Sequence, residues 1–94
     1  METSAARLRA RVFGLVQGVN FRYTTRERAA ALGLKGWVRN EWDGSVAVEA
    51  EGPRPALEQF LDFLHHGPRH AEVERVDTEW LPAAGDLTRF EIRS

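Results

Sequence analysis

The sequence predicts an α+β fold in which two helices cover one face of an antiparallel sheet. Three features point to it: a segment of strictly alternating polarity near the N-terminus, two segments whose apolar residues recur with helical spacing, and breaks containing Gly or Pro between the segments. The length of 94 residues suits one hydrophobic core. We therefore expect a single domain over residues 1–94, with residues 1–6 as a flexible N-terminal extension.

The first expected strand spans residues 7–13, where basic and apolar residues alternate. This is the period of a strand with one buried and one exposed face. Leu8, Ala10 and Val12 should face the core. The interleaved side chains should face solvent, namely Arg7, Arg9 and Arg11. A loop over residues 14–20 follows.

The first expected helix begins at Phe21, with Asn20 as its N-cap, and ends before Gly33. Its apolar residues follow the spacing i, i+4, i+8 and i+11, which lines one face of a helix. These residues are Phe21, Thr25, Ala29 and Leu32.

Two further strands are expected over residues 35–40 and 45–51. Asp43-Gly44 between them has the residue types of a hairpin turn. In the second of these strands, alternate residues should face the core: Val46, Val48 and Ala50. The first of them closes with Asn40.

A second helix should follow the break at residues 52–55, because proline is tolerated in a first helical turn. Gly67-Pro68 should end it. Its apolar stripe consists of Leu57, Phe60, Leu61 and Leu64.

The last two strands are expected over residues 73–80 and 87–93. Val73 and Val76 have opposite parity, which indicates either a bulge or a misplaced strand. The resulting order, β-α-β-β-α-β plus a short C-terminal strand, is that of the ferredoxin-like split β-α-β sandwich. This fold hosts many functions, so the order alone assigns none.

The loop over residues 14–20 has features of an anion site. Gly14 and Gly18 allow backbone conformations that let successive N–H groups converge, and the following helix adds its positive dipole end. Arg22 in the first turn can offer a two-pronged contact to phosphate oxygens. In the split fold the first two strands end at the same edge, with one strand between them, so Asn40 should lie about 10 Å from this loop. An ordinary turn, a solvent-exposed Arg22 and a turn role for Asn40 are the alternatives.

Two separated motifs resemble the signatures of the acylphosphatase family. The first is Gly14-Leu15-Val16-Gln17-Gly18-Val19-Asn20-Phe21-Arg22, which is similar to a V-Q-G-V-x-F-R loop. The second is Gly36-Trp37-Val38-Arg39-Asn40, followed by Gly44, Val46 and Gly52 at matching spacing. The expected element order extends the resemblance over residues 7–93.

The resemblance implies a metal-independent enzyme that uses no cofactor and hydrolyses acyl phosphates to a carboxylate and inorganic phosphate. The phosphoryl group would be bound by Arg22 and by the backbone amides of Leu15, Val16, Gln17, Gly18, Val19 and Asn20. Asn40 would hold and orient the attacking water. The partners would be a small-molecule acyl phosphate and inorganic phosphate, the latter as product and inhibitor.

Composition narrows the competing functions. The absence of cysteine excludes thiolate metal sites and a cysteine nucleophile, and is compatible with a reducing cytoplasm. The net charge of −1 gives no general argument for nucleic acid. RNA-recognition modules share the element order but stack bases on strand aromatics, whereas the matching third-strand positions here are Ala47, Glu49 and Glu51.

Other expectations concern location, assembly and metal. Residues 1–6 lack the apolar core of a signal peptide, and no apolar run approaches the roughly 20 residues that span a bilayer. We therefore expect a cytoplasmic monomer that binds neither membrane nor nucleic acid. His65, His66 and His70 lack a carboxylate or cysteine to complete a zinc site, so no metal is expected. A phosphate-sensing domain without turnover and a carbamoyl-phosphate-handling domain of a larger enzyme are the remaining alternatives, although 94 residues suggest a stand-alone protein.

Overall fold

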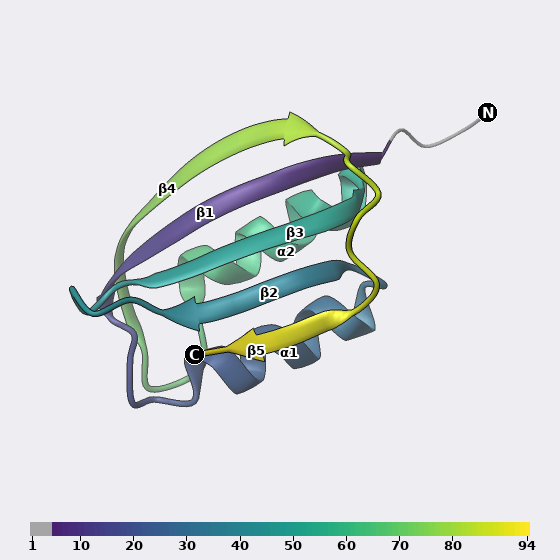
Figure 1. The fold of residues 1–94 in the computed structure, drawn as a ribbon. Helices are drawn as coiled ribbons and strands as arrows, with labels where there is room; N and C mark the ends of the chain where they lie inside the picture. The colour runs from purple at the N-terminus through teal and green to yellow at the C-terminus, as the bar shows by residue number, and fades with distance from the viewer. Residues whose placement is uncertain (1–4) are drawn as a thin grey trace.

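The structure, a computed structural model, describes residues 5–94. Two helices and five strands follow one another along the chain: β1 Ala5–Leu15, α1 Phe21–Ala31, β2 Lys35–Asn40, β3 Val46–Pro53, α2 Arg54–His66, β4 Glu72–Pro82 and β5 Phe90–Arg93. The strand order in the sheet is β4-β1-β3-β2-β5. Both helices cover the same face of this sheet (Figure 1). The predicted ferredoxin-like α+β fold is therefore confirmed.

The sheet is antiparallel as predicted except for its last strand. β1 pairs antiparallel with β3 and with β4, and β2 pairs antiparallel with β3. β5 runs parallel to β2. Gly36 N–H donates to the Arg89 carbonyl oxygen at 2.9 Å, which attaches the start of β5 to β2. The segment from residue 87 to 89, expected to be strand, precedes β5 and is not part of it.

The core lies between the sheet and the helices. Leu8, Ala10 and Val12 are buried as predicted. Arg9 and Arg11 are exposed as expected, whereas Arg7 is largely shielded from solvent by carboxylates. In α1 the buried residues are Phe21, Thr25 and Ala29, whereas Leu32 is half-buried at the C-cap. In α2, Phe63 is buried and Leu61 is only half-buried, so the stripe is rotated slightly from the predicted one. The remaining predicted core positions, Val46, Val48, Ala50, Leu57, Phe60 and Leu64, are buried.

Several boundaries differ from the predicted ones. β1 begins at Ala5, so Ala5 and Ala6 belong to the sheet and not to the expected extension, while residues 1–4 lie outside the described part of the chain. The break expected at residues 52–55 contains no loop, because β3 ends at Pro53 and α2 starts at Arg54. The expected bulge in β4 is present: Phe13 pairs with Arg75 and Gly14 with Val73, which leaves Glu74 as the extra residue.

Candidate active site

The loop between β1 and α1 begins at the β4 bulge. Gly14 has φ 134°, and a Cβ there would overlap the Glu72 carbonyl oxygen. Only glycine therefore allows β1 to stay paired with β4 while the chain turns away. The chain leaves the sheet after Leu15, and α1 begins at Phe21. This local geometry places the loop at the edge where β1 and β2 end.

Two residues of the loop have left-handed backbone conformations. Gly18 has φ 76° and Asn20 has φ 64°. Asn20 occupies the N-cap position of α1 as predicted, but its side chain makes no capping hydrogen bond, because the residue is left-handed and not extended. Asparagine tolerates this region better than most residues. Alternation of backbone handedness turns neighbouring N–H groups toward one concavity, which is the geometry of an anion-binding nest.

The loop amides are free to bind a ligand. Among residues 5–94, the backbone–backbone hydrogen bonds outside helices and strands use no N–H of residues 16–20 as a donor. α1 adds the positive end of its dipole, and its first turn contains no acidic residue that would compete for the amides. The segment therefore offers uncompensated positive potential.

One cavity joins the loop to the two predicted functional side chains. Its volume is about 280 Å³, and it is lined by Val16, Gly18, Asn20, Phe21, Arg22, Tyr23, Asn40 and Ile92. Ligand pockets for larger molecules usually hold roughly 300–1,000 Å³, so this one suits a small group. Of the predicted loop residues, Leu15, Gln17 and Val19 do not line it, and Leu15 is 56% exposed.

Among residues 5–94, neither Arg22 nor Asn40 has a side-chain partner. Within the described residues, Arg22 makes no ion pair or side-chain hydrogen bond. Asn40 lies at the end of β2 on the same face as the buried Gly36 and Val38, toward the helices. Its Oδ1 atom is shielded from solvent and has no hydrogen-bond partner in the part of the chain that the structure describes. A buried acceptor without a partner is costly unless a ligand or water completes it.

The Gln17 side chain has a role that the sequence did not indicate. Its Nε2 atom donates to the Glu41 carbonyl oxygen at 2.6 Å and to the Ser45 carbonyl oxygen at 2.9 Å. These bonds tie the loop to the β2–β3 turn that follows Asn40. Their partners are 24 and 28 residues away, so no local pattern could reveal them. Phe21 and Tyr23, which flank Arg22, and the distant Ile92 were also missed as lining residues.

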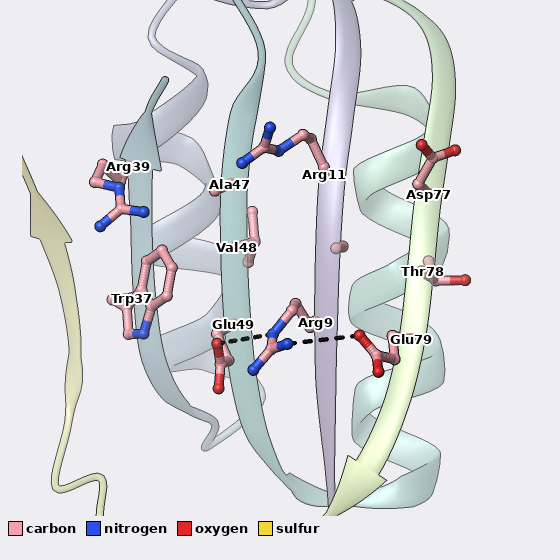
Figure 2. Close-up of a pocket in the computed structure, with 11 residues that line it drawn as sticks. Arg9, Arg11, Trp37, Arg39, Ala47, Val48, Glu49, Asp77, Thr78 and Glu79 are labelled. Carbon is pink, nitrogen blue, oxygen red and sulfur yellow. Dashed lines mark hydrogen bonds and ion pairs between the residues drawn. The ribbon is translucent and has the colours of Figure 1, made fainter. Parts of the chain in front are cut away.

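A second hollow, of about 420 Å³, lies on the open face of the sheet (Figure 2). It is larger, but it contains none of the predicted site residues and lies over β-strand side chains such as Arg9, Trp37 and Glu49. The smaller cavity is the better candidate because it combines free amides, an unpaired guanidinium and an unpaired amide oxygen.

Metal and membrane features are not found in the described residues. Residues 5–94 contain no group of three or more His, Cys, Asp or Glu side chains placed to hold a metal ion. His65, His66 and His70 are exposed, and His66 Nδ1 lies 2.9 Å from the Asp62 carbonyl oxygen. In the same part of the chain, no helix has the length and apolarity needed to cross a membrane.

Comparison with known proteins matches the chain to one family. The acylphosphatase family model covers residues 8–92. An acylphosphatase of Salinibacter ruber is 53% identical over 99% of both chains. The crystal structure of acylphosphatase from Bacillus subtilis is 35% identical, with a TM-score of 0.91, and the match covers 95% of this chain and 99% of that one. An acylphosphatase structure from Coxiella burnetii is 34% identical, with a TM-score of 0.90 over 96% and 94% of the two chains. The chain therefore belongs to the acylphosphatase family of enzymes.

Proposed function

We propose that the enzyme hydrolyses the carboxyl-phosphate anhydride of small acyl phosphates, with Arg22 and the loop amides holding the phosphoryl group and Asn40 orienting the attacking water. The observation that carries the proposal is the shared cavity, in which Arg22 and Asn40 face the same small volume as Gly18 and Asn20. The family and its relatives, named as acylphosphatases, support the reaction class.

Binding follows from the charge and geometry of the loop. The phosphoryl oxygens accept hydrogen bonds from the free amides of residues 16–20, whose left-handed members at Gly18 and Asn20 curve the backbone around an anion. Leu15, also expected to contribute an amide, is the last residue of β1 and is paired with β4. The Arg22 guanidinium adds a two-pronged charged contact and has no internal carboxylate to release first, within residues 5–94. These groups need no reorganisation when charge develops on the phosphoryl oxygens in the transition state.

The residues that line the site are sufficient for the chemical step. Water attacks phosphorus, the new P–O bond forms, and the bond to the acyl oxygen breaks with its electron pair going to the carboxylate. A carboxylate whose conjugate acid has a pKa near about 4 leaves unprotonated, so no general acid is required. The unpaired Oδ1 of Asn40 accepts a hydrogen bond from the water and fixes its direction. The water proton passes to an oxygen of the bound phosphate.

Steady-state hydrolysis of benzoyl phosphate by wild type and Asn40→Ala tests this proposal. Removing a group that positions the nucleophile should lower kcat by about 10²–10⁴-fold, because such groups act mainly in the transition state. The stabilisation by inorganic phosphate should persist, since the anion contacts are intact. Asn40→Asp should weaken both phosphate binding and turnover by placing a negative charge beside the anion, and higher ionic strength should relieve part of that loss.

The same assay distinguishes this enzyme from a phosphate-sensing domain that binds the anion without turnover. Such a domain would bind phosphate but release no carboxylate at a rate above the uncatalysed one. An Asn40→Ala enzyme that keeps its kcat and only raises KM would make Asn40 a binding residue and would contradict the mechanism.

Action as a cytoplasmic monomer is also part of this proposal. Sedimentation equilibrium at working concentration should give a mass near 10.6 kDa. Cell fractionation should place the protein with the cytoplasmic fraction.

A further inference from the structure

The turn that follows Asn40 is tightly organised by its own backbone. Glu41 N–H donates to the Ser45 carbonyl oxygen at 2.8 Å, and Gly44 N–H donates to the Glu41 carbonyl oxygen at 3.1 Å. Asp43 Oδ1 accepts from both the backbone N–H and the hydroxyl of Ser45, at 2.9 and 2.6 Å. The turn therefore moves as one unit, and any group that holds it also holds the end of β2.

The Glu41 carboxylate ties this unit to the open face of the sheet. Arg39 Nε donates to Glu41 Oε2 at 2.7 Å, and Arg11 Nη2 lies 3.5 Å from Glu41 Oε1. Arg11 and Arg39 are the cross-strand neighbours of Ala47 on its two sides. Figure 2 shows these two arginines flanking the small Ala47 side chain at one end of the open-face hollow. One carboxylate thus bridges two strands, β1 and β2.

The carboxylate of this bridge is shielded, whereas the Arg39 and Arg11 side chains are 38% and 44% exposed. The Glu41 side chain is 16% exposed, compared with 58% for Glu79, which pairs with Arg9 on the same face at 3.5 Å. Exposed pairs usually contribute about 0–1 kcal/mol, and shielding strengthens an ion pair when both ends have good geometry. Glu41 has that geometry toward Arg39 and a second cation in Arg11.

Glu41 is consequently held from both sides of the sheet. Gln17 holds its carbonyl oxygen from the side of the anion-binding loop, and the two arginines hold its carboxylate from the open face. Successive strand residues point to opposite faces, so Arg39 lies on the open face while Asn40 faces the cavity. A force on Glu41 therefore acts directly on the backbone that orients the Asn40 amide.

We propose that Glu41, bridged to Arg11 and Arg39, is a positioning residue for the reaction: it fixes the β2–β3 turn and, through it, the direction of the Asn40 side chain. The proposal rests on the role proposed above for Asn40. Catalysis by a positioned water is sensitive to displacements well below 1 Å, so a change confined to the opposite face of the sheet can lower the rate.

Replacing Glu41 by a neutral residue should change different kinetic constants, depending on whether Glu41 acts by positioning Asn40 or only by its charge. Removing a negative charge close to an anionic substrate strengthens binding, which lowers KM and leaves kcat unchanged. Loss of positioning lowers kcat and leaves KM and the phosphate-induced thermal stabilisation in place. The two readings are therefore separated by the kinetic constant that changes.

The test compares Glu41→Gln with the matched control Glu79→Gln, at a temperature where circular dichroism shows that both variants are folded. We expect Glu41→Gln to lower kcat for benzoyl phosphate by about 3–30-fold, whereas Glu79→Gln should keep the wild-type value. Raising ionic strength should lower the kcat of wild type toward that of Glu41→Gln and affect the variant less. In an Asn40→Ala background, Glu41→Gln should have no further effect on kcat, because there is no amide left to position.

Equal kcat values for the two glutamine variants, a decrease in KM alone, or a Glu41→Gln effect that persists without Asn40 would each overturn this proposal. The proposed function fails separately: if Asn40→Ala leaves kcat unchanged, Asn40 does not orient the water, whatever Glu41 does. If Asn40→Ala lowers kcat and Glu41→Gln does not, only the positioning role is wrong.

Discussion

Arg7 and Arg22 show that the same type of side chain has two different roles in this protein. Arg7 Nε donates to Glu49 at 2.6 Å, and its Nη1 donates to Glu51 at 3.1 Å and to Asp86 at 2.6 Å. Its side chain is 12% exposed. Arg22, at the opposite end of the sheet's length, is half-buried beside the anion-binding loop and pairs with no carboxylate among residues 5–94.

The difference lies in which charges the fold supplies. Around Arg7 the sheet provides the anions itself, and Glu51 also accepts hydrogen bonds from Ala84 and Gly85 N–H, so the cluster attaches the 84–86 segment to β3. Around Arg22 the described part of the chain provides further hydrogen-bond donors, the loop amides, and no paired carboxylate. A guanidinium that is paired with several carboxylates stabilises the fold. A guanidinium surrounded only by other hydrogen-bond donors can bind an external anion.

The largest expected effect is on catalysis by Arg22 variants. Arg22→Ala should lower kcat/KM for benzoyl phosphate by about 10³-fold or more, since a charged contact to the transferring group is lost. Arg22→Lys should recover little, because a point charge lacks the planar fork. Arg26→Ala removes the same charge one turn later in α1 and should stay within a few-fold of wild type. Equal losses for Arg22→Ala and Arg26→Ala would reduce the effect to general electrostatics.

Arg7→Met should show the reverse pattern. Breaking a shielded network leaves Glu51 without its cation and Glu49 with Arg9 alone, at 3.4 Å, so the free energy of unfolding should fall by roughly 2–4 kcal/mol. Urea denaturation measures this change. Activity below the unfolding transition should stay within a few-fold of wild type, because Arg7 is far from the cavity-lining residues in the sheet. If Arg7→Met is as stable as wild type but inactive, Arg7 acts in catalysis and not in stability, which contradicts this account.

Acid should weaken the Arg7 cluster. Hydrogen bonds from Ala84 N–H and Gly85 N–H lower the pKa of Glu51, and the hydrogen bond from Arg7 lowers the pKa of Asp86. Groups with a depressed folded-state pKa stabilise the protein above their unfolded pKa, and that contribution is lost as pH falls through the folded value. Stability measured by urea midpoints should therefore decline below about pH 4. Glu51→Gln should reduce this pH dependence, whereas Asp77→Asn, in an exposed pair with Arg75, should change it little.

The smallest expected effect is that of metal removal. Charge at the proposed site comes from Arg22 and amides, so prolonged chelation should leave kcat unchanged. Replacing His65, His66 and His70 together should change kcat by less than a few-fold. Loss of activity on chelation, restored by one defined metal, would contradict this expectation.

Local periodicity predicted much of the fold. The alternation in residues 7–13 and the helical spacing from Phe21 report which side of β1 and of α1 is buried, and the structure confirms those sides. In β3 the predicted inner residues are buried, but so are Ala47 and Glu49 on the other face. β2 spans the predicted residues 35–40. The split order of the strands then implied that the loop and Asn40 meet at one edge, and they line the same cavity.

What the sequence missed depends on partners distant along the chain. Periodicity does not say which strand lies beside which, so the parallel pairing of β5 with β2 and the place of Ile92 at the cavity were not predictable. The Gln17 and Glu41 contacts join segments that only tertiary structure brings together. The left-handed conformation of Asn20 also departs from the expected cap, because the residue type suits both conformations.

Thermal unfolding in the presence of inorganic phosphate tests the central claim most directly. A ligand that binds only the folded protein stabilises it by about 2.7 kcal/mol at 100 times its Kd. Wild type and Arg7→Met should both gain unfolding temperature in phosphate relative to chloride at equal ionic strength, even though Arg7→Met starts lower. Arg22→Ala should lose most of that gain and keep only the general effect of an excluded salt. If Arg22→Ala retains the full gain while Arg7→Met loses it, the anion binds at the Arg7 cluster and the assignment of the two regions is reversed.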